Sequence, residues 1–544
     1  MMKLKKNDIV QVEISDLSKE GMGIGRADQI VVFVDGALPQ EKIEVKIIKT
    51  AKSYCVGKLL QVMKPSHLRT QPLCPVFEKC GGCSLQHLQY MGQLMAKHGQ
   101  VKNCLQKIGG CDTEVAYPLP SRSPFAYRNK CAFPVARAEG GKVVIGCYAR
   151  RSHRVVPVEK CLIQQPEMEN VLRAVKEFME AYGISPYDEQ SGRGLVRHVI
   201  CRMNKWQEIM VGIVIHGKRL DHERELVQTL KLYVDGLNSV VINQNTSRGN
   251  VILGDQSRAI YGQEYLVEEI MGLKFQISLN SFLQVNPYGM ELLYTNALKM
   301  AGLKRDDVVV DLYCGAGTIS LCAAQKCGKV YGVEIVPQAI ENAKRNAQLN
   351  GIHNAEFLLG DCEEIFPKVR KKEGKIDVII VDPPRKGLSQ QVVSSCIEAQ
   401  PRKIVYVSCD PATLARDIKL FAQGGYACEG VQPVDMFPQT MHVETVALLS
   451  KLKTDKHIDV ELEMNELDLT AAEKKATYEE IKEYVLDHSG LKVSNLYIAQ
   501  VKQKCGIIER ENYNKPKPEN AKQPKCPPEK EKAIMEALKH FGMI

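Results

Sequence analysis

The stretch Val308–Thr318, VVVDLYCGAGT, decides the fold of this 544-residue chain. Its apolar run ends in Asp311 and passes into a glycine-containing turn, and the next segment, ISLCAAQKC, reads as a helix. Further strands and helices alternate after it, among them KVYGVEIV, PQAIENAKRNAQLNG, IDVIIVDPP and KIVYVSCDP. This alternation predicts an α/β fold with a parallel, doubly wound sheet of the Rossmann-like type.

Carboxylates follow four successive strands of the predicted sheet: Asp311, Glu334, Asp361 and Asp382. Ligands of open α/β sheets bind at the carboxyl ends of strands, so we expect one site there. Glu334 is placed to accept from ribose hydroxyls, and Asp361 to accept from an adenine amino group. A GxG turn alone also fits nicotinamide enzymes, but residues 318–320, Thr-Ile-Ser, omit the third glycine of the dinucleotide fingerprint. A cofactor with ribose and no phosphates, S-adenosylmethionine, is therefore predicted.

Cys409 stands at the end of another strand, in YVSCDPATLARD, residues 406–417. Most free cysteines in proteins are small buried hydrophobic residues. The alternative is nucleophilic catalysis: a thiolate that adds to uracil C6 makes C5 an enolate carbon able to accept a methyl group. Because a helix begins directly after it, we expect a lowered pKa for the Cys409 thiol.

Such a reaction also needs a base that removes the C5 proton. The segment MFPQTMHVETVALLS supplies Glu444, with His442 on the same face of the predicted strand. Glu444 is preferred because the strand after it is apolar, and burial would raise its pKa. The turn at Asp382 ends in Arg385, where enzymes that methylate amino groups carry an aromatic residue.

Composition and cysteine usage indicate a cytoplasmic, monomeric protein without a membrane span. The 19 cysteines are then expected to be thiols, metal ligands or nucleophiles. Three of them, Cys74, Cys80 and Cys83, lie in the short segment CPVFEKCGGC, and a fourth ligand would close a site. The candidates for it are Cys104, Cys111, Cys131, Cys147 and Cys161. Four thiolates suit either structural zinc or an iron–sulfur cluster.

Four regions are predicted along the chain. Residues 1–66 read as a small OB-like β-barrel, and residues 67–270 as a mixed, mostly β region that contains the cysteines. Part of the latter, roughly residues 90–120, is expected to pack with the catalytic domain, residues 271–452. Residues 453–544 form an extension that contains either a helix-turn-helix, with Lys502 and Lys504 facing phosphate, or an amphipathic interaction helix.

Two basic segments point to RNA as a partner. Residues 41–64 carry six lysines against two glutamates. Residues 121–154 carry eight Arg or Lys against one acid, interleaved with Phe125, Tyr127, Phe133 and Tyr148. Cations that bind phosphate and aromatic rings that stack on bases suit single-stranded or looped RNA.

Five motifs resemble the RNA (uracil-5-)-methyltransferase family, in particular its bacterial 23S rRNA members: DLYCGAGT, VEIVPQAIENAKRNAQLNG, DPPRKG, YVSCDPATLARD and MFPQTMHVET. The resemblance covers about residues 1–450, and the N-terminal barrel resembles a TRAM domain. It implies that Cys409 is the nucleophile and Glu444 the base. It also implies a set of S-adenosylmethionine contacts: Gln284, Tyr313, Glu334 and Asp382, with Thr318 at a position where some relatives have Asn. The cysteine pattern is similar to that of members holding a [4Fe-4S] cluster, with Cys161 as the fourth ligand.

The function implied is methylation of C5 of a specific uridine in 23S rRNA. A tRNA (uracil-5-)-methyltransferase is the alternative with the same chemistry, although such enzymes typically lack the barrel and the cysteine cluster. A cytosine-5 RNA methyltransferase would usually carry a cysteine after the fourth-strand proline, where Pro384 and Arg385 stand. A protein that binds RNA without catalysis would leave Cys409 and Glu444 unexplained.

Overall fold

The computed structural model describes residues 4–138, 140–452, 478–505, 526–541 and 543. The chain divides into two compact units, Met1–Lys453 and Thr454–Ile544, and each is described by itself. None of the helices in the described ranges has the length and apolar character needed to cross a membrane.

The N-terminal strands form a closed barrel in the order β1-β2-β3-β5-β4, which confirms the expected OB-like module. They are β1 (Ile9–Leu17), β2 (Gly23–Ala27), β3 (Ile30–Val34), β4 (Lys42–Thr50) and β5 (Tyr54–Lys64). Alternate residues of β4 point inward, as its apolar/polar alternation predicts. Gly57 permits the tight closure, because a Cβ there would lie 2.0 Å from Val45 Cγ1.

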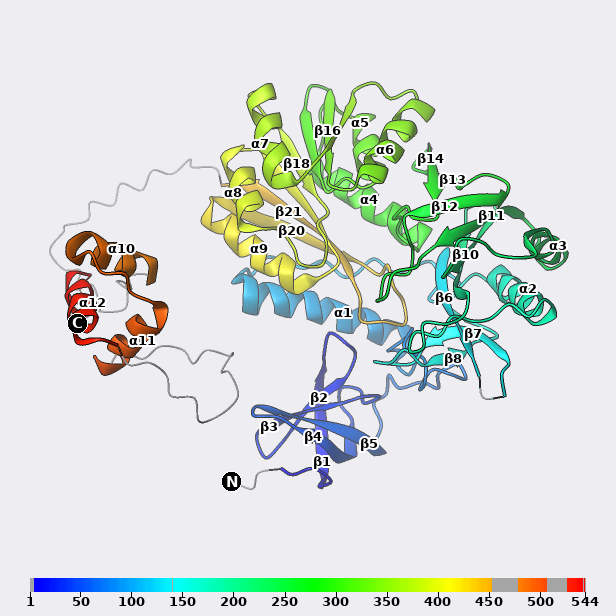
Figure 1. Ribbon diagram of the computed structural model, residues 1–544, viewed down its shortest axis with the longest axis horizontal. Helices are drawn as coiled ribbons and strands as arrows, with labels where there is room; N and C mark the ends of the chain where they lie inside the picture. Colours follow the sequence, from blue (N-terminus) through cyan, green and yellow to red (C-terminus); the bar gives the residue numbers. More distant parts are fainter. Residues whose placement is uncertain (1–3, 139, 453–477, 506–525, 542, 544) are drawn as a thin grey trace. The chain divides into compact units, whose positions relative to one another are not determined.

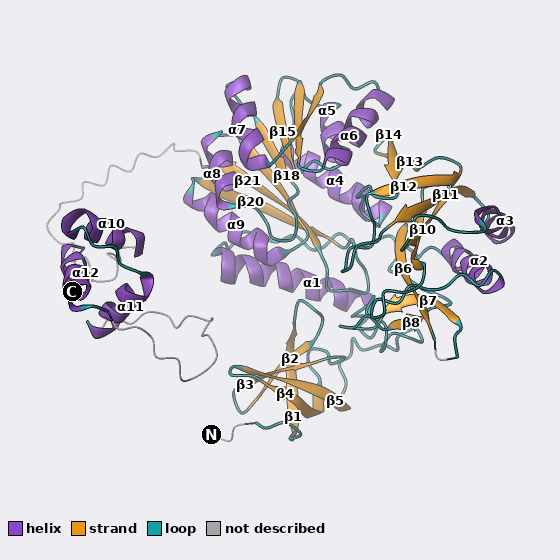
Figure 2. Ribbon diagram, viewed as in Figure 1, coloured by secondary structure: helices purple, strands orange, loops and turns teal. Residues whose placement is uncertain are grey.

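The next region is built on a seven-stranded sheet of order β12-β11-β10-β9-β6-β7-β8 (Figures 1 and 2). Its strands are β6 (Lys130–Arg137), β7 (Val143–Tyr148), β8 (Val155–Pro157), β9 (Val196–Met203), β10 (Ile209–Ile215), β11 (Leu237–Gln244) and β12 (Gln256–Tyr261). Helices α2 (Glu167–Ala181) and α3 (Glu223–Tyr233) pack against each other and against this sheet. A hairpin, β13 (Tyr265–Ile270) and β14 (Leu273–Ser278), follows.

The second seven-stranded sheet has the order β17-β16-β15-β18-β19-β21-β20. Its strands are β15 (Val308–Leu312), β16 (Lys329–Glu334), β17 (Ala355–Leu359), β18 (Val378–Val381), β19 (Lys403–Ser408), β20 (Tyr426–Val434) and β21 (Glu444–Lys451). The first five are parallel and confirm the predicted α/β fold. Strand β21 runs antiparallel to both of its neighbours, β19 and β20, because β20 and β21 are joined as a hairpin instead of by a crossover.

Helices cover both faces of this sheet (Figure 2). They are α4 (Pro287–Ala301), α5 (Thr318–Ala324), α6 (Pro337–Leu349), α7 (Cys362–Glu373), α8 (Gln390–Glu398) and α9 (Pro411–Gln423). Helix α1 (Tyr90–Cys104) comes from an earlier part of the chain, yet it packs against α9 and β20. The segment after α1 continues along β20, with bridges from Val115 to Val431 and from Leu119 to Val434.

The C-terminal unit contains α10 (Tyr478–Ser489), α11 (Asn495–Lys504) and α12 (Pro528–His540), which pack around a small apolar core. The prediction that Lys502 and Lys504 face phosphate is wrong for Lys502. This residue is buried, and its Nζ lies 4.4 Å from the Tyr478 ring centroid. Lys504 forms an ion pair with Glu531 of α12. Lys502 is therefore engaged inside the unit, whereas the Lys504 side chain is 67% exposed and paired at the surface. Residues 453–477, with which the predicted extension begins, lie outside the described residues.

Candidate active site

The carboxyl ends of parallel strands meet at one edge of the catalytic sheet, and the predicted site residues lie along that edge. Asp311 lies in β15, Glu334 ends β16, and Asp382 directly follows β18. Asp361 follows β17 and caps α7, where its carboxylate accepts a hydrogen bond from Glu363 N–H at 2.9 Å.

Cys409 and Glu444 are placed opposite each other by strand register. In the antiparallel pairing of β19 with β21, Ser408 lies opposite Thr445. The next residue along one strand is Cys409, and the next along the other is Glu444. Glu444 also stands opposite Val434 in the pairing of β20 with β21, which holds its backbone at the start of β21.

The Glu444 side chain is 2% exposed, and its Oε2 has no hydrogen-bond partner among the described residues. Burial, together with the neighbouring Asp382 carboxylate, raises the pKa of Glu444 to about 8, while Arg385 acts in the opposite direction. The apolar sequence of β21 predicts this burial. A carboxylate with a pKa near neutrality and an unused oxygen is suited to accept a proton.

The expectation of a lowered pKa for Cys409 is wrong. Burial raises the pKa of its thiol to about 11, and the charges of Glu444 and Asp382 add to this effect. The helix start does not compensate, because Asp410 caps α9 and accepts from the free N–H groups of its first turn, that of Ala412 at 2.9 Å among them.

His442 does not share a strand face with Glu444, contrary to the sequence prediction. Strand β21 begins at Glu444, so His442 lies in the preceding loop, where its side chain is exposed. Its ring stands edge-on to that of Phe437, with the centroids 6.1 Å apart. Of these two candidate bases, Glu444 is therefore the one that is buried at the sheet edge.

Hydrogen bonds join the turn after β15 to the end of β16, where one cofactor is expected to contact both segments. Tyr313 has φ +67°, which is rare for a bulky residue. The N–H groups of Tyr313 and Cys314 both donate to Val333 O, at 2.9 and 3.1 Å. Glu334 Oε2 accepts from Gly315 N–H at 3.2 Å. Strain of this kind persists where the surroundings hold the backbone, and it is common at ligand sites.

Two further predicted residues are buried beside this edge. Gln284, 5% exposed, lies in the loop 279–286 between β14 and α4. Thr318 begins α5, and its hydroxyl lies 3.1 Å from that of Tyr294. Sequence reasoning missed Phe282, two residues before Gln284, whose ring is 73% exposed and could stack on a nucleic-acid base.

The cysteines of the N-terminal half surround one cavity of about 210 Å³. Its lining includes six of them: Cys74, Cys80, Cys83, Cys131, Cys147 and Cys161. Two of the candidates for the fourth ligand are elsewhere, since Cys104 and Cys111 pack in the catalytic core. The four predicted ligands are thus brought together, with two additional thiols beside them. Within the described ranges, no three His, Cys, Asp or Glu residues are placed to hold a single metal ion together.

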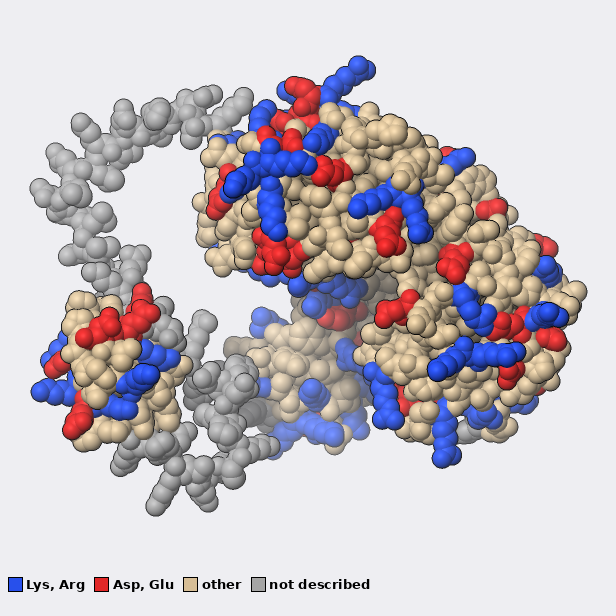
Figure 3. Space-filling view, turned by 45° about the horizontal axis from the view of Figure 1, so that its top comes forward, with Lys and Arg blue, Asp and Glu red and all other residues tan. Residues whose placement is uncertain are grey.

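The predicted RNA surface is partly corrected by burial. Tyr127 and Phe133 are core residues, so their rings cannot stack on bases. Lys130 donates to Leu279 O at 3.1 Å, inside the protein. Other basic residues are exposed: Lys42, Lys49, Lys52, Lys58 and Lys64 of the barrel segment, and Arg122, Arg137, Lys142, Arg151 and Arg154 of the central region. Figure 3 shows Lys and Arg side chains on the surfaces of both parts.

Two protein-family models match the chain. Residues 89–452 match the tRNA (uracil-5-)-methyltransferase family, and residues 3–60 match the TRAM domain. The chain belongs to the tRNA (uracil-5-)-methyltransferase family. It is thus a member of the S-adenosylmethionine-dependent methyltransferases that act on C5 of uracil in RNA, and its barrel is a TRAM domain.

Two relatives are similar to this chain over most of its length. An uncharacterised RNA methyltransferase of Halalkalibacterium halodurans is 44% identical over 448 residues, which are 82% of this chain and 98% of the relative. One from Caldanaerobacter subterraneus is 44% identical over 453 residues, 83% of this chain and 100% of the relative. Nearly a fifth of this chain therefore has no counterpart in them.

Among solved structures, the chain is similar to the Pyrococcus abyssi tRNA (uracil-54, C5)-methyltransferase in complex with S-adenosyl-L-homocysteine. The TM-score is 0.66 and the identity 28%, over 81% of this chain and 100% of that one. A tRNA enzyme can thus match this chain over most of its length.

Proposed function

We propose that this chain methylates C5 of a specific uridine in 23S rRNA, with Cys409 as nucleophile and Glu444 as base. The observation that carries the proposal is the register of β19 and β21, which sets the thiol opposite a buried carboxyl at the sheet edge. S-adenosylmethionine, when bound, supplies the methyl group. Its proposed contacts are Gln284, Tyr313, Glu334, Asp382, Asp361 and Thr318.

The steps follow from the two side chains. The Cys409 thiolate adds to uracil C6, forming a C–S bond and moving the C5–C6 electron pair onto C5 and O4 as an enolate. C5 then takes the methyl group that S-adenosylmethionine would supply, and S-adenosylhomocysteine would be the second product. Glu444 removes the C5 proton, the C5–C6 double bond re-forms, and the C–S bond breaks to release the thiolate. The raised pKa of Glu444 suits it to accept this proton and afterwards return it to solvent.

A tRNA uridine is the second candidate substrate, because the Pyrococcus abyssi enzyme named above acts on tRNA. Tritium release from RNA labelled at uracil C5, assayed with 23S rRNA and with tRNA separately, distinguishes the two. We expect release from rRNA that is lost in Cys409→Ala. Release from tRNA alone would keep the chemistry and change the substrate. Methyl transfer without tritium release would overturn the mechanism.

We also propose that Cys74, Cys80, Cys83 and Cys161 hold a [4Fe-4S] cluster. A zinc ion with Zn–S bonds of about 2.3 Å would draw four sulfur atoms close together, whereas each thiolate of a cluster binds a different iron. The thiols of Cys74, Cys80, Cys83 and Cys161 line one cavity of about 210 Å³, and this supports a shared site for the four. Anaerobically purified protein should contain four irons and four sulfides per chain. One zinc and no sulfide would refute this proposal.

A further inference from the structure

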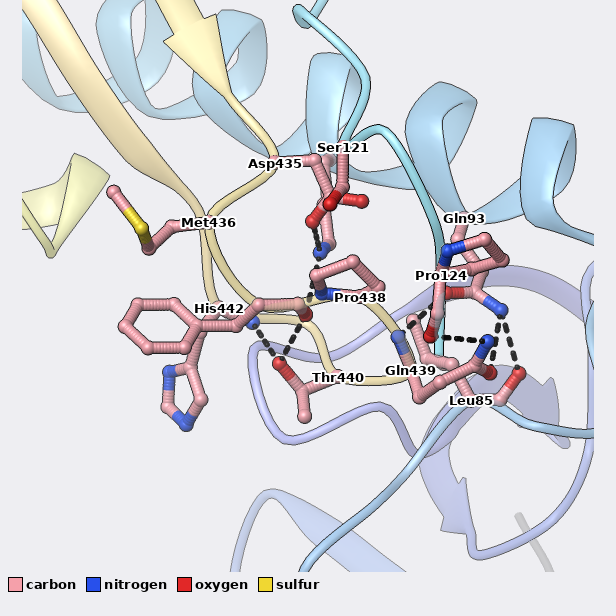
Figure 4. A network of polar contacts seen from close by, with 12 residues as sticks. Leu85, Gln93, Ser121, Pro124, Asp435, Met436, Pro438, Gln439, Thr440 and His442 are labelled. Carbon is pink, nitrogen blue, oxygen red and sulfur yellow. Dashed lines mark hydrogen bonds and ion pairs between the residues drawn. The ribbon is translucent and has the colours of Figure 1, made fainter. Parts of the chain in front are cut away.

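The loop between β20 and β21, residues 435–443, leads directly into Glu444 and is held by an unusually dense set of polar contacts (Figure 4). At its start, Asp435 forms an ion pair with Lys97 of α1, and both side chains are fully buried. Lys97 Nζ also donates to Phe437 O at 3.0 Å. A buried pair of this kind holds the loop firmly, because removing either partner strands the other charge.

Gln439 is the centre of the loop. It is 3% exposed and has φ +69°, a conformation that a side chain longer than Asn seldom adopts. Its backbone N–H donates to Gln93 Oε1 at 2.9 Å, and its own Oε1 accepts from Gln93 Nε2 at 3.0 Å. The Gln93 side chain of α1 is thus paired with both the backbone N–H and the side chain of Gln439 in the loop. Figure 4 shows both, with the exposed His442 further along the same loop.

The same residue is joined to the cysteine segment. Gln439 O accepts from the N–H groups of both Ser84 and Leu85, each at 2.9 Å. These residues directly follow Cys83. Tyr127, which precedes a residue of the cysteine cavity, donates its hydroxyl to Pro438 O at 3.0 Å. The contacts therefore connect the segment that carries the cysteines with the loop that ends at Glu444.

We propose that Gln439, paired with Gln93, is a positioning residue. Through Gln439, the ordered cysteine segment holds Glu444 in the position needed for proton removal. The inference rests on the proposed function, since it concerns the group that removes the C5 proton. A strained backbone in a fully buried, hydrogen-bonded site persists only where its surroundings over-determine it. Here the surroundings come from the residues after Cys83 and from α1, both more than 300 residues earlier in the chain.

The test separates positioning from plain packing by looking at the elimination step. If Glu444 is misplaced, the thiolate still adds and C5 is still methylated, but the proton leaves slowly. The methylated RNA then stays covalently attached to Cys409 and survives denaturing electrophoresis. Displacements of about 1 Å cost on the order of 100-fold in rate, so we expect elimination to slow by roughly 10- to 100-fold.

The variants are Gln439→Ala, Gln439→Gly, which suits the left-handed backbone, and Gln93→Leu. Gln432→Ala is the matched control, because this glutamine lies on β20 and also bonds to the segment after α1, at Tyr117 O, 2.9 Å away. We expect the covalent complex to accumulate in the first three and in Glu444→Gln, at unchanged affinity for S-adenosylmethionine. The control should behave as the wild type.

Cys83→Ser tests the connection to the cysteine segment. It should also accumulate the covalent complex. The double variant with Gln439→Ala should accumulate no more of this complex than the single variants do. A loss of turnover in the Gln439 and Gln93 variants without accumulation, or with weakened cofactor affinity, would make the pair ordinary packing and overturn the inference. Failure of the wild type to release tritium would instead overturn the proposed function.

Discussion

Glu444→Gln should make Cys409 more reactive, and only at alkaline pH. The thiol pKa of about 11 lies two units above the ordinary value of 9.0, which corresponds to about 2.7 kcal/mol and about 100-fold less thiolate below pH 9. Burial is the largest cause and the Glu444 charge the next. The substitution removes only the second, so thiolate formation should rise by less than about 100-fold.

The pH range follows from the pKa of Glu444. Below about pH 8 its carboxyl is protonated and exerts no charge on the thiol, so wild type and variant should react alike. Above pH 8 the wild-type carboxylate is charged, and the two alkylation rates should separate.

Iodoacetamide labelling of Cys409, followed by peptide mass spectrometry between pH 6 and 10.5, measures both rates in one series. Glu429→Gln is the control, because this glutamate is exposed on β20 of the same hairpin. Coincident profiles for wild type and Glu444→Gln over the whole range would refute the placement of the carboxyl beside the thiol.

Three further outcomes follow from the structure. Burial raises the pKa of Glu444 from 4.5 to about 8. The protonated carboxyl therefore contributes fully to the stability of the folded state below pH 4.5, and this contribution is lost as the pH rises to 8. The folded state loses about 3–5 kcal/mol of stability over this range, so Glu444→Gln should melt at a higher temperature than wild type at pH 9 but not at pH 5. The same difference in melting temperature at both pH values would contradict this. Lys97→Met should cost about 3–5 kcal/mol in urea unfolding by stranding Asp435, and adding Asp435→Asn should recover most of it. Deleting residues 453–544 should leave the salt dependence of RNA binding unchanged, because Lys504 is already in an ion pair; a shallower slope would place that unit on phosphate.

The parts of this protein that sequence predicts well are those governed by local pattern. Alternation along residues 42–50 predicts a half-buried strand, and the structure has one. The apolar run into Asp311 and the turn after it predict the first strand of an α/β sheet, and β15 lies there.

Sequence fails where distant segments decide the environment. The pKa of Cys409 depends first on burial and then on the charges of Glu444, Asp382 and Arg385. The cap formed by Asp410 also occupies the amides that would otherwise favour a thiolate. The burial of Phe133 depends on residues that pack over the central sheet, and Tyr127 bonds to Pro438 of the distant β20–β21 loop. No periodicity in their own segments predicts these contacts.

The link between α1 and the β20–β21 loop has a consequence for synthesis of the chain. The bonded residues lie up to 346 positions apart, so at 5–20 residues per second α1 leaves the ribosome about 20–70 s before its partner loop is made. During that time Lys97 and Gln93 remain hydrated and the face of α1 destined for the interior remains uncovered. The TRAM barrel, whose strands are contiguous in the chain, can close within that interval. A newly made chain would therefore possess an RNA-binding module well before Glu444 reaches its place.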